Sequence, residues 1–230
     1  MAQDKRLVWD LPLRLFHWVL VLSLIASWVT AELGIEWREY HMWLGYWMLG
    51  LIIFRVLWGL IGPRHARFAS FLPSPMRLFR YIRDSLAGHA RETVGHNPLG
   101  SLMVVAMLIL LSVQVGTGLF ATDEIIWTGP WYPAVTNATA KALTKFHHFN
   151  FNLIAAAIIV HLIAVAFHWV VRKHNLVVPM ITGKKEADLV PPTEAIASSR
   201  LWLAAIVIAV SAGCAWGIIA AAPPPPPSLY

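Results

Sequence analysis

Charged residues and cysteine are both scarce in this sequence. Only 13% of its 230 residues are charged and 58% are hydrophobic, which excludes an ordinary soluble fold. The single cysteine, Cys214, cannot form an internal disulfide, a four-thiolate iron–sulfur site or a C-x-x-C-H haem attachment. Any metal cofactor must therefore depend on histidine, methionine or carboxylate ligands.

Five apolar runs approach or exceed the length of about 20 residues that crosses a bilayer as a helix. They predict transmembrane helices over about residues 15–31, 40–61, 98–120, 146–171 and 201–222. Pro98 suits the first turn of the third helix. We therefore expect an all-α integral membrane protein.

The charges are distributed unevenly between the two sides that these helices define. Of the 18 Lys and Arg residues, 14 fall on the side of the N-terminus, and Arg38, Lys141 and Lys145 fall on the other. This bias predicts a cytoplasmic N-terminus and a periplasmic C-terminus. The net charge of +6 thus reports orientation and does not indicate a nucleic-acid partner.

Two segments outside the apolar runs have a pattern of their own. After Ser74 and Pro75, which resemble a helix start, apolar residues recur at helical spacing beside a stripe of arginines. The apolar residues are Met76, Phe79, Ile82 and Leu86, and the basic ones are Arg77, Arg80 and Arg83. The pattern favours a short helix on the anionic membrane surface, with a solvated basic loop as the alternative. Residues 223–227 are all proline and predict an extended tail.

Four histidines lie within or at the ends of the predicted helices, where an ionisable side chain is costly. His41 and His147 each begin a helix at the outer face, so they share a level. His161 lies 14 residues deeper than His147, about 21 Å along the same helix face, and His17 lies 14 residues from the outer end of its own helix. The spacing predicts two pairs, His41 with His147 and His17 with His161. His168 is the rival of His161, and any single histidine could instead be hydrogen-bonded core.

Iron suits imidazole, and two imidazoles fill both axial positions of a haem. No open site then remains, which favours electron transfer over chemistry at the metal. Gly45, Gly116 and Gly118 could give a flat ring room, although small residues are as common in plain helix packing. Arg55 lies 14 residues after His41 and could pair with a haem propionate, or extend toward the headgroups instead.

These residues resemble the bacterial cytochrome b561 superfamily, and in particular the cytochrome b subunits that anchor nickel–iron hydrogenases. The resemblance is carried by residues 8–18 (VWDLPLRLFHW), by the histidine spacings and by residues 95–100 (GHNPLG). It covers about residues 7–185, and it leaves 186–230 as a linker, the fifth helix and the tail.

The resemblance implies a four-helix transmembrane bundle that holds two non-covalent haems b, to which this chain adds one C-terminal helix. It assigns the inner haem to His17 and His161 and the outer haem to His41 and His147. It also implies electron transfer in the bacterial inner membrane between quinone, which the chain could itself bind, and a periplasmic redox protein or catalytic subunit. A superoxide:quinone oxidoreductase is the alternative function. A metal or proton transporter is more remote, because the broken helices and inverted repeats typical of transporters are not visible.

Overall fold

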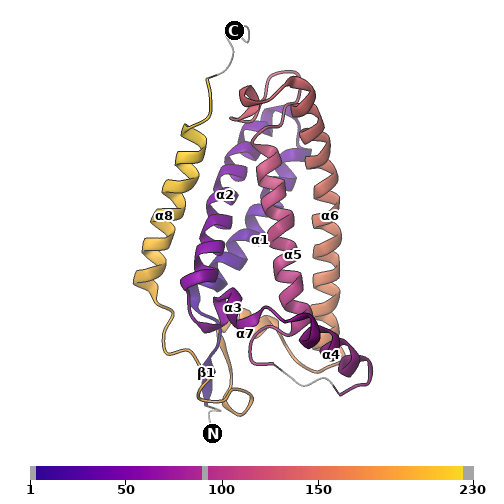
Figure 1. Cartoon of the computed structure of the whole chain (residues 1–230), viewed down its shortest axis with the longest axis vertical. Helices are drawn as coiled ribbons and strands as arrows, with labels where there is room; N and C mark the ends of the chain where they lie inside the picture. The colour runs from indigo at the N-terminus through magenta and orange to yellow at the C-terminus, as the bar shows by residue number, and fades with distance from the viewer. Residues whose placement is uncertain (1–3, 90–92, 225–230) are drawn as a thin grey trace. The chain divides into compact units, whose positions relative to one another are not determined.

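Five long helices dominate the computed structural model, which describes residues 4–89 and 93–224 (Figure 1). Each is long and apolar enough to cross a membrane. They are α1 (Leu11–Glu32), α2 (Arg38–Ile61), α5 (Pro98–Gly118), α6 (Asn137–Val170) and α8 (Leu201–Ala220). All five predicted helices are therefore present.

The largest difference from the predicted bounds is the start of α6. The helix begins at Asn137 rather than near residue 146. Its first turns carry Lys141 and Lys145 and are capped by Thr136, whose hydroxyl accepts a hydrogen bond from the backbone N–H of Thr139 at 3.2 Å. A capped polar turn is a good helix start but has no apolar signal, so counting hydrophobic residues missed it.

Large apolar side chains are exposed along all five long helices. Leu22, Trp43, Ile109, Ile163 and Trp216 are examples, one from each helix. A soluble protein rarely exposes so much contiguous apolar surface, whereas a lipid-facing helix requires it. The protein is thus a multi-pass membrane protein.

The chain forms two compact units. The first unit holds Met1–Phe16, Arg55–Ala106 and Ile158–Ile206, and the second holds His17–Phe54, Met107–Ala157 and Val207–Tyr230. Every long helix contributes one stretch to each unit. The first unit contains the starts of α1, α5 and α8 and the ends of α2 and α6, as expected when consecutive spans alternate in direction.

Most short elements belong to the first unit. They are β1 (Lys5–Leu7), η2 (Arg64–Ala66), α3 (Phe68–Phe71), α4 (Pro75–Leu86), α7 (Val177–Thr182), β2 (Lys184–Glu186) and η4 (Ala187–Leu189). Figure 1 shows α3, α4, α7 and β1 at one end of this unit. The predicted helix after Ser74 is present as α4. The second unit adds η1 (Ile35–Trp37) and η3 (Tyr132–Ala134).

A small sheet in the first unit was not predicted. Strands β1 and β2 pair antiparallel, with Lys5 opposite Glu186 and Leu7 opposite Lys184. The chain after β2 continues along the N-terminal segment, where the N–H of Ile196 donates to the carbonyl of Leu7 at 2.9 Å. The predicted boundary between residues 185 and 186 therefore falls within β2.

Helix α8 has one buried face. It consists of Ala204, Val207, Ser211 and Ala215, and in the second unit the indole N–H of Trp131 donates to the carbonyl of Ile218 at 2.9 Å. Most of the predicted proline tail lies outside the described residues.

Candidate functional site

Two predicted ligands, His41 on α2 and His147 on α6, face each other in the second unit. Their ring centroids are 6.2 Å apart and the rings are inclined at 80°. The metal–imidazole bond length is about 2 Å. Two such bonds on opposite sides of one iron place the ring centroids about 6 Å apart, so the observed separation fits a shared axial pair.

Each of these rings is oriented by a backbone carbonyl of a neighbouring helix. Nδ1 of His41 lies 2.8 Å from the carbonyl oxygen of Ser27 on α1, and Nδ1 of His147 lies 2.9 Å from that of Gln114 on α5. A carbonyl can only accept, so Nδ1 carries the proton in both rings. Nε2 then keeps its lone pair, which is the tautomer that a metal-binding histidine needs.

The two anchoring carbonyls have the same surroundings. Each also accepts from a threonine hydroxyl three residues later, from Thr30 to Ser27 and from Thr117 to Gln114, both at 3.0 Å. Thr117 additionally lies 3.1 Å from Nδ1 of His147. The amide of Asn150 on α6 donates to the side-chain oxygen of Gln114 at 2.8 Å and thereby ties α6 to α5.

Two imidazoles suffice for haem iron because the porphyrin supplies the other four ligands. Within the described residues, no three His, Cys, Asp or Glu side chains gather into a site for a bare metal ion. A Cβ added at Gly45 or Gly116 would meet nothing described within 4 Å, whereas one at Gly118 would lie 3.2 Å from Cε1 of His147. Gly45 and Gly116 thus leave open space, and Gly118 makes room for the imidazole itself.

The comparisons with known proteins agree with this geometry. The model of the prokaryotic cytochrome b561 family matches residues 8–183. The chain belongs to the prokaryotic cytochrome b561 family. It is accordingly a membrane-spanning b-type haem protein that transfers electrons.

The chain is also similar to curated proteins described as probable Ni/Fe-hydrogenase B-type cytochrome subunits. The protein of Azotobacter chroococcum mcd 1 is 24% identical, with 76% of this chain and 86% of the relative covered. That of Cupriavidus necator is 23% identical, with 76% and 85% covered. No solved structure gives a significant match.

The two predicted inner ligands belong to different units of this cytochrome b561. His17 on α1 belongs to the second unit and His161 on α6 to the first, and both are half-buried. His168, the rival, is half-buried on the same helix as His161. The pairing of His17 with His161 remains a prediction.

Arg55 is buried, with 2% of its surface exposed. Its guanidinium donates to the carbonyl of Ala66 at 3.3 Å and lies 4.7 Å from the centre of the Phe68 ring. These contacts hold η2 and α3 against α2 and do not show the side chain extending toward headgroups. A role for Arg55 with a propionate remains a prediction.

Asp10 has a structural role that was not predicted from the sequence. It is fully buried, and its Oδ1 accepts from the N–H of Leu13 and from the indole of Trp58, each at 2.9 Å. Asp10 thus caps α1 and ties it to α2. Burial raises the pKa of the Asp10 carboxyl, and these two bonds and the charge of Arg55 oppose that rise. The signal was an acidic residue directly before an apolar run, which is typical of a helix N-cap.

Two histidines outside the long helices, His65 and His96, both contact Trp9. His65 is buried, and its Nε2 lies 2.8 Å from the carbonyl oxygen of Glu194. The ring of His96 lies 4.7 Å from that of Trp9 and 4.8 Å from that of Phe71. Burial lowers the pKa of His65, and burial, followed by the charge of Arg55, lowers the pKa of His96 to about 3.

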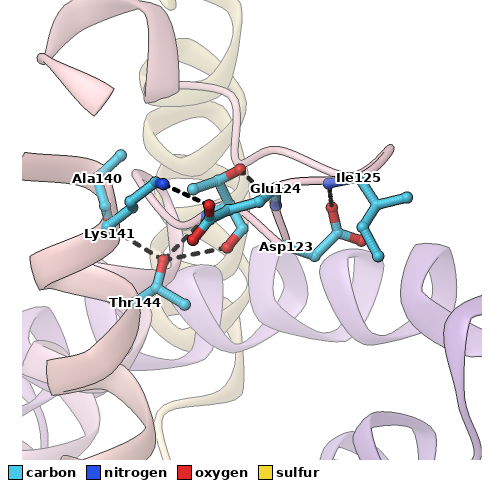
Figure 2. A network of polar contacts seen from close by, with 7 residues as sticks. Asp123, Glu124, Ile125, Ala140, Lys141 and Thr144 are labelled. Carbon is cyan, nitrogen blue, oxygen red and sulfur yellow. Dashed lines mark hydrogen bonds and ion pairs between the residues drawn. The ribbon is translucent and has the colours of Figure 1, made fainter. Parts of the chain in front are cut away.

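The α5–α6 connection in the second unit is a turn held by hydrogen bonds and an ion pair (Figure 2). Asp123 accepts from three successive N–H groups, those of Ile125, Ile126 and Trp127. Although burial alone would raise it, the pKa of Asp123 is lowered by these three bonds. Lys141 on α6 forms an ion pair with Glu124. These contacts fix the turn to the α6 extension, on the helix that carries His147.

Proposed function

We propose that this protein carries electrons across the bacterial inner membrane through two bis-histidine haems b. In this proposal it links the quinone pool to a periplasmic redox protein or catalytic subunit. The observation that carries the proposal is the His41–His147 pair, because its separation and its tautomers fit the two sides of one iron. The hydrogenase subunit names of the relatives support a catalytic partner.

A bound haem b supplies a one-electron couple, and the protein positions and tunes it. His41 and His147 would hold the outer haem iron through Nε2. Their Nδ1–H groups donate to Ser27 and Gln114, which fixes the rings and makes the imidazoles better donors. With both imidazoles engaged, the haem would serve electron transfer rather than chemistry on a bound substrate.

His17 and His161 are the proposed ligands of the inner haem, with His168 as the competing ligand. The proposal places this haem nearer the cytoplasm, where it exchanges electrons with a quinone, and gives Arg55 a propionate as partner. The basic residues concentrated on one side support a cytoplasmic N-terminus and a periplasmic C-terminus. Four helices within residues 7–185 would form the haem bundle, and α8 would pack beside it.

A reduced-minus-oxidised spectrum with haem quantitation tests this proposal on the purified protein. We expect two haems b per chain, and the loss of one haem in each of the variants His17→Ala, His41→Ala, His147→Ala and His161→Ala. His168→Ala is the matched control and should retain both. A single haem in the wild type would refute the two-haem proposal, and loss of haem in His168→Ala but not in His161→Ala would reassign the inner ligand.

The partners need an independent measurement. When a quinol or quinone analogue is added to membranes that contain the protein, its haems should be reduced or oxidised. In the His41→Ala variant only electron transfer to the periplasmic side should stop. Sustained turnover of superoxide with quinone by the isolated protein would contradict a subunit role and favour the self-contained oxidoreductase.

A further inference from the structure

The exposed face of α4 is an apolar surface that the described chain leaves uncovered. No residue of α4 is buried, and Phe79 and Leu86 are 67% and 86% exposed. At about 100° per residue, Phe79, Ile82 and Leu86 fall within about 60° of one another. The less exposed residues, Leu78, Tyr81, Asp84 and Ser85, fall on another side. The helix therefore packs with one side and presents a second, apolar side outward.

Three arginines are placed unequally around this outward side. Arg83 lies about 40° from Phe79 around the helix axis, Arg80 about 100° and Arg77 about 160°. Arg83 and Arg80 thus border the apolar side, whereas Arg77 is nearly opposite. Arg83 also forms an exposed ion pair with Asp84 through Nη2 and Nε, in which its Nη1 takes no part. Long basic side chains at such a border can reach headgroups while the apolar residues enter the acyl region.

The neighbouring contacts hold the start of α4 near a membrane-crossing helix. The connection between the consecutive spans α2 and α5 lies on one side of the membrane by topology. Within it, the Phe68 ring packs on Arg55 of α2, and the hydroxyl of Ser101, in the first turn of α5, donates to the carbonyl of Phe71 at 2.9 Å. Only residues 72–74 separate this contact from Pro75, the first residue of α4.

A twelve-residue helix is marginally stable alone in water, so its apolar side needs a covering. We propose that α4 lies in the bilayer surface and binds anionic lipid headgroups through Arg80 and Arg83. The bilayer is the occupant because α4 begins four residues after a contact with a membrane span, and its bordering charges complement anionic headgroups. This proposal does not depend on how many haems the protein holds.

The test uses the full-length, haem-loaded protein in lipid nanodiscs made with or without phosphatidylglycerol. In a Cys214→Ala background, a spin label at Phe79→Cys reports on the apolar side and one at Arg77→Cys on the opposite side. With phosphatidylglycerol we expect the label at residue 79 to be relaxed by oxygen, as in lipid, and the label at residue 77 by a water-soluble nickel chelate. Without anionic lipid the immersion at residue 79 should decrease.

Substitution of the arginines separates the charge from the apolar side. R80Q/R83Q should lower the docking equilibrium in phosphatidylglycerol discs by about fivefold per arginine, and R77Q, the control on the same helix, by less. An unchanged haem spectrum shows that each variant is folded. The proposal is overturned if the label at residue 79 stays as water-accessible as that at 77, if immersion is equal in both lipids, or if R77Q matches R80Q/R83Q.

Discussion

Two pairs of histidines are at least partly buried, but their rings are arranged differently. One pair is His41 and His147 in the second unit, and the other is His65 and His96 in the first. In the second unit each Nδ1 donates to a carbonyl, and the two rings face each other with Nε2 left over. In the first unit Nε2 of His65 is occupied by the carbonyl of Glu194. The backbone of Gly95 lies so close to Nδ1, the remaining nitrogen of His65, that an added Cβ would come within 2.8 Å of it.

The contrast shows that burial of a histidine does not identify a ligand. What distinguishes His41 and His147 is a fixed tautomer together with a facing partner. The histidines around Trp9 instead pack against aromatic rings, and burial, followed by the charge of Arg55, keeps the ring of His96 neutral by lowering its pKa. The two pairs therefore predict different responses to substitution.

The largest difference should follow removal of one imidazole from each pair. His147→Ala should lose a haem, because a single axial histidine and an apolar gap cannot hold it, whereas His65→Ala should retain the full haem content. Haem quantitation against protein concentration measures both. Equal haem loss in the two variants would remove the distinction between ligand and packing histidines.

Asp10→Ala should produce the next largest effect, now on stability. It removes two buried hydrogen bonds, from the indole N–H of Trp58 and the N–H of Leu13, and the carboxylate that interacts electrostatically with Arg55. Losses of this kind cost about 3 kcal/mol together. Unfolding in mixed detergent, followed by circular dichroism, gives this free energy.

Asp10→Asn separates the hydrogen bonds from the charge. The amide oxygen still accepts at the Oδ1 position, so we expect it to recover more than half of the loss. Should the Asn variant be as unstable as the Ala variant, the charge facing Arg55 would be the dominant contribution and the capping bonds a minor one.

The sequence predicted those features of the site that follow from counting residues along the helices. Apolar runs define the five spans, and the expected outer starts of two of them predict that His41 and His147 share a level. The anchors of these rings could not be predicted, because Ser27 and Gln114 act through backbone carbonyls that every residue has.

Contacts between residues distant in the sequence could not be predicted for a related reason. Trp58 reaches Asp10 across 48 residues. Strands β1 and β2 are only three residues long, rich in lysine and separated by more than 170 residues. Neither has the alternation that marks a half-buried strand, so only the folded chain shows them. The N-cap signal at Asp10 was readable, but its partner was not.

The histidines around Trp9 predict that the stability of the folded protein is sensitive to acid. The pKa of His96 is lowered from 6.5 to about 3, so between these values the unfolded chain binds a proton that the folded chain does not. Stability should therefore fall as the pH decreases below about 6.5, by up to about 1.4 kcal/mol per unit. His65 contributes with the same sign, and Asp10, whose pKa is raised, with the opposite sign.

His96→Phe should remove the contribution of His96 to this sensitivity while keeping a ring against Trp9 and Phe71. Relative to wild type, we expect a gain of about 2 kcal/mol near pH 5 and little change at neutral pH. Detergent unfolding at a series of pH values measures it, with the exposed His89→Phe as control. A parallel pH profile in His96→Phe and wild type would show that His96 is not the titrating group.

The smallest expected effect concerns the tuning of the facing pair. Because Nδ1 of His147 carries the proton, the Thr117 hydroxyl at 3.1 Å can only accept from it, as a second acceptor beside Gln114. Thr117→Val removes that acceptor, the imidazole becomes a weaker donor, and ferric iron is less stabilised. A loss of about 0.5 kcal/mol corresponds to a rise of about 20 mV in the midpoint potential of one haem. Ser112→Ala, on the same helix but bonded only to the carbonyl of Leu108, should leave both potentials unchanged. A redox titration that found a lowered potential in Thr117→Val, or equal shifts in both variants, would mean that the hydroxyl does not act through His147.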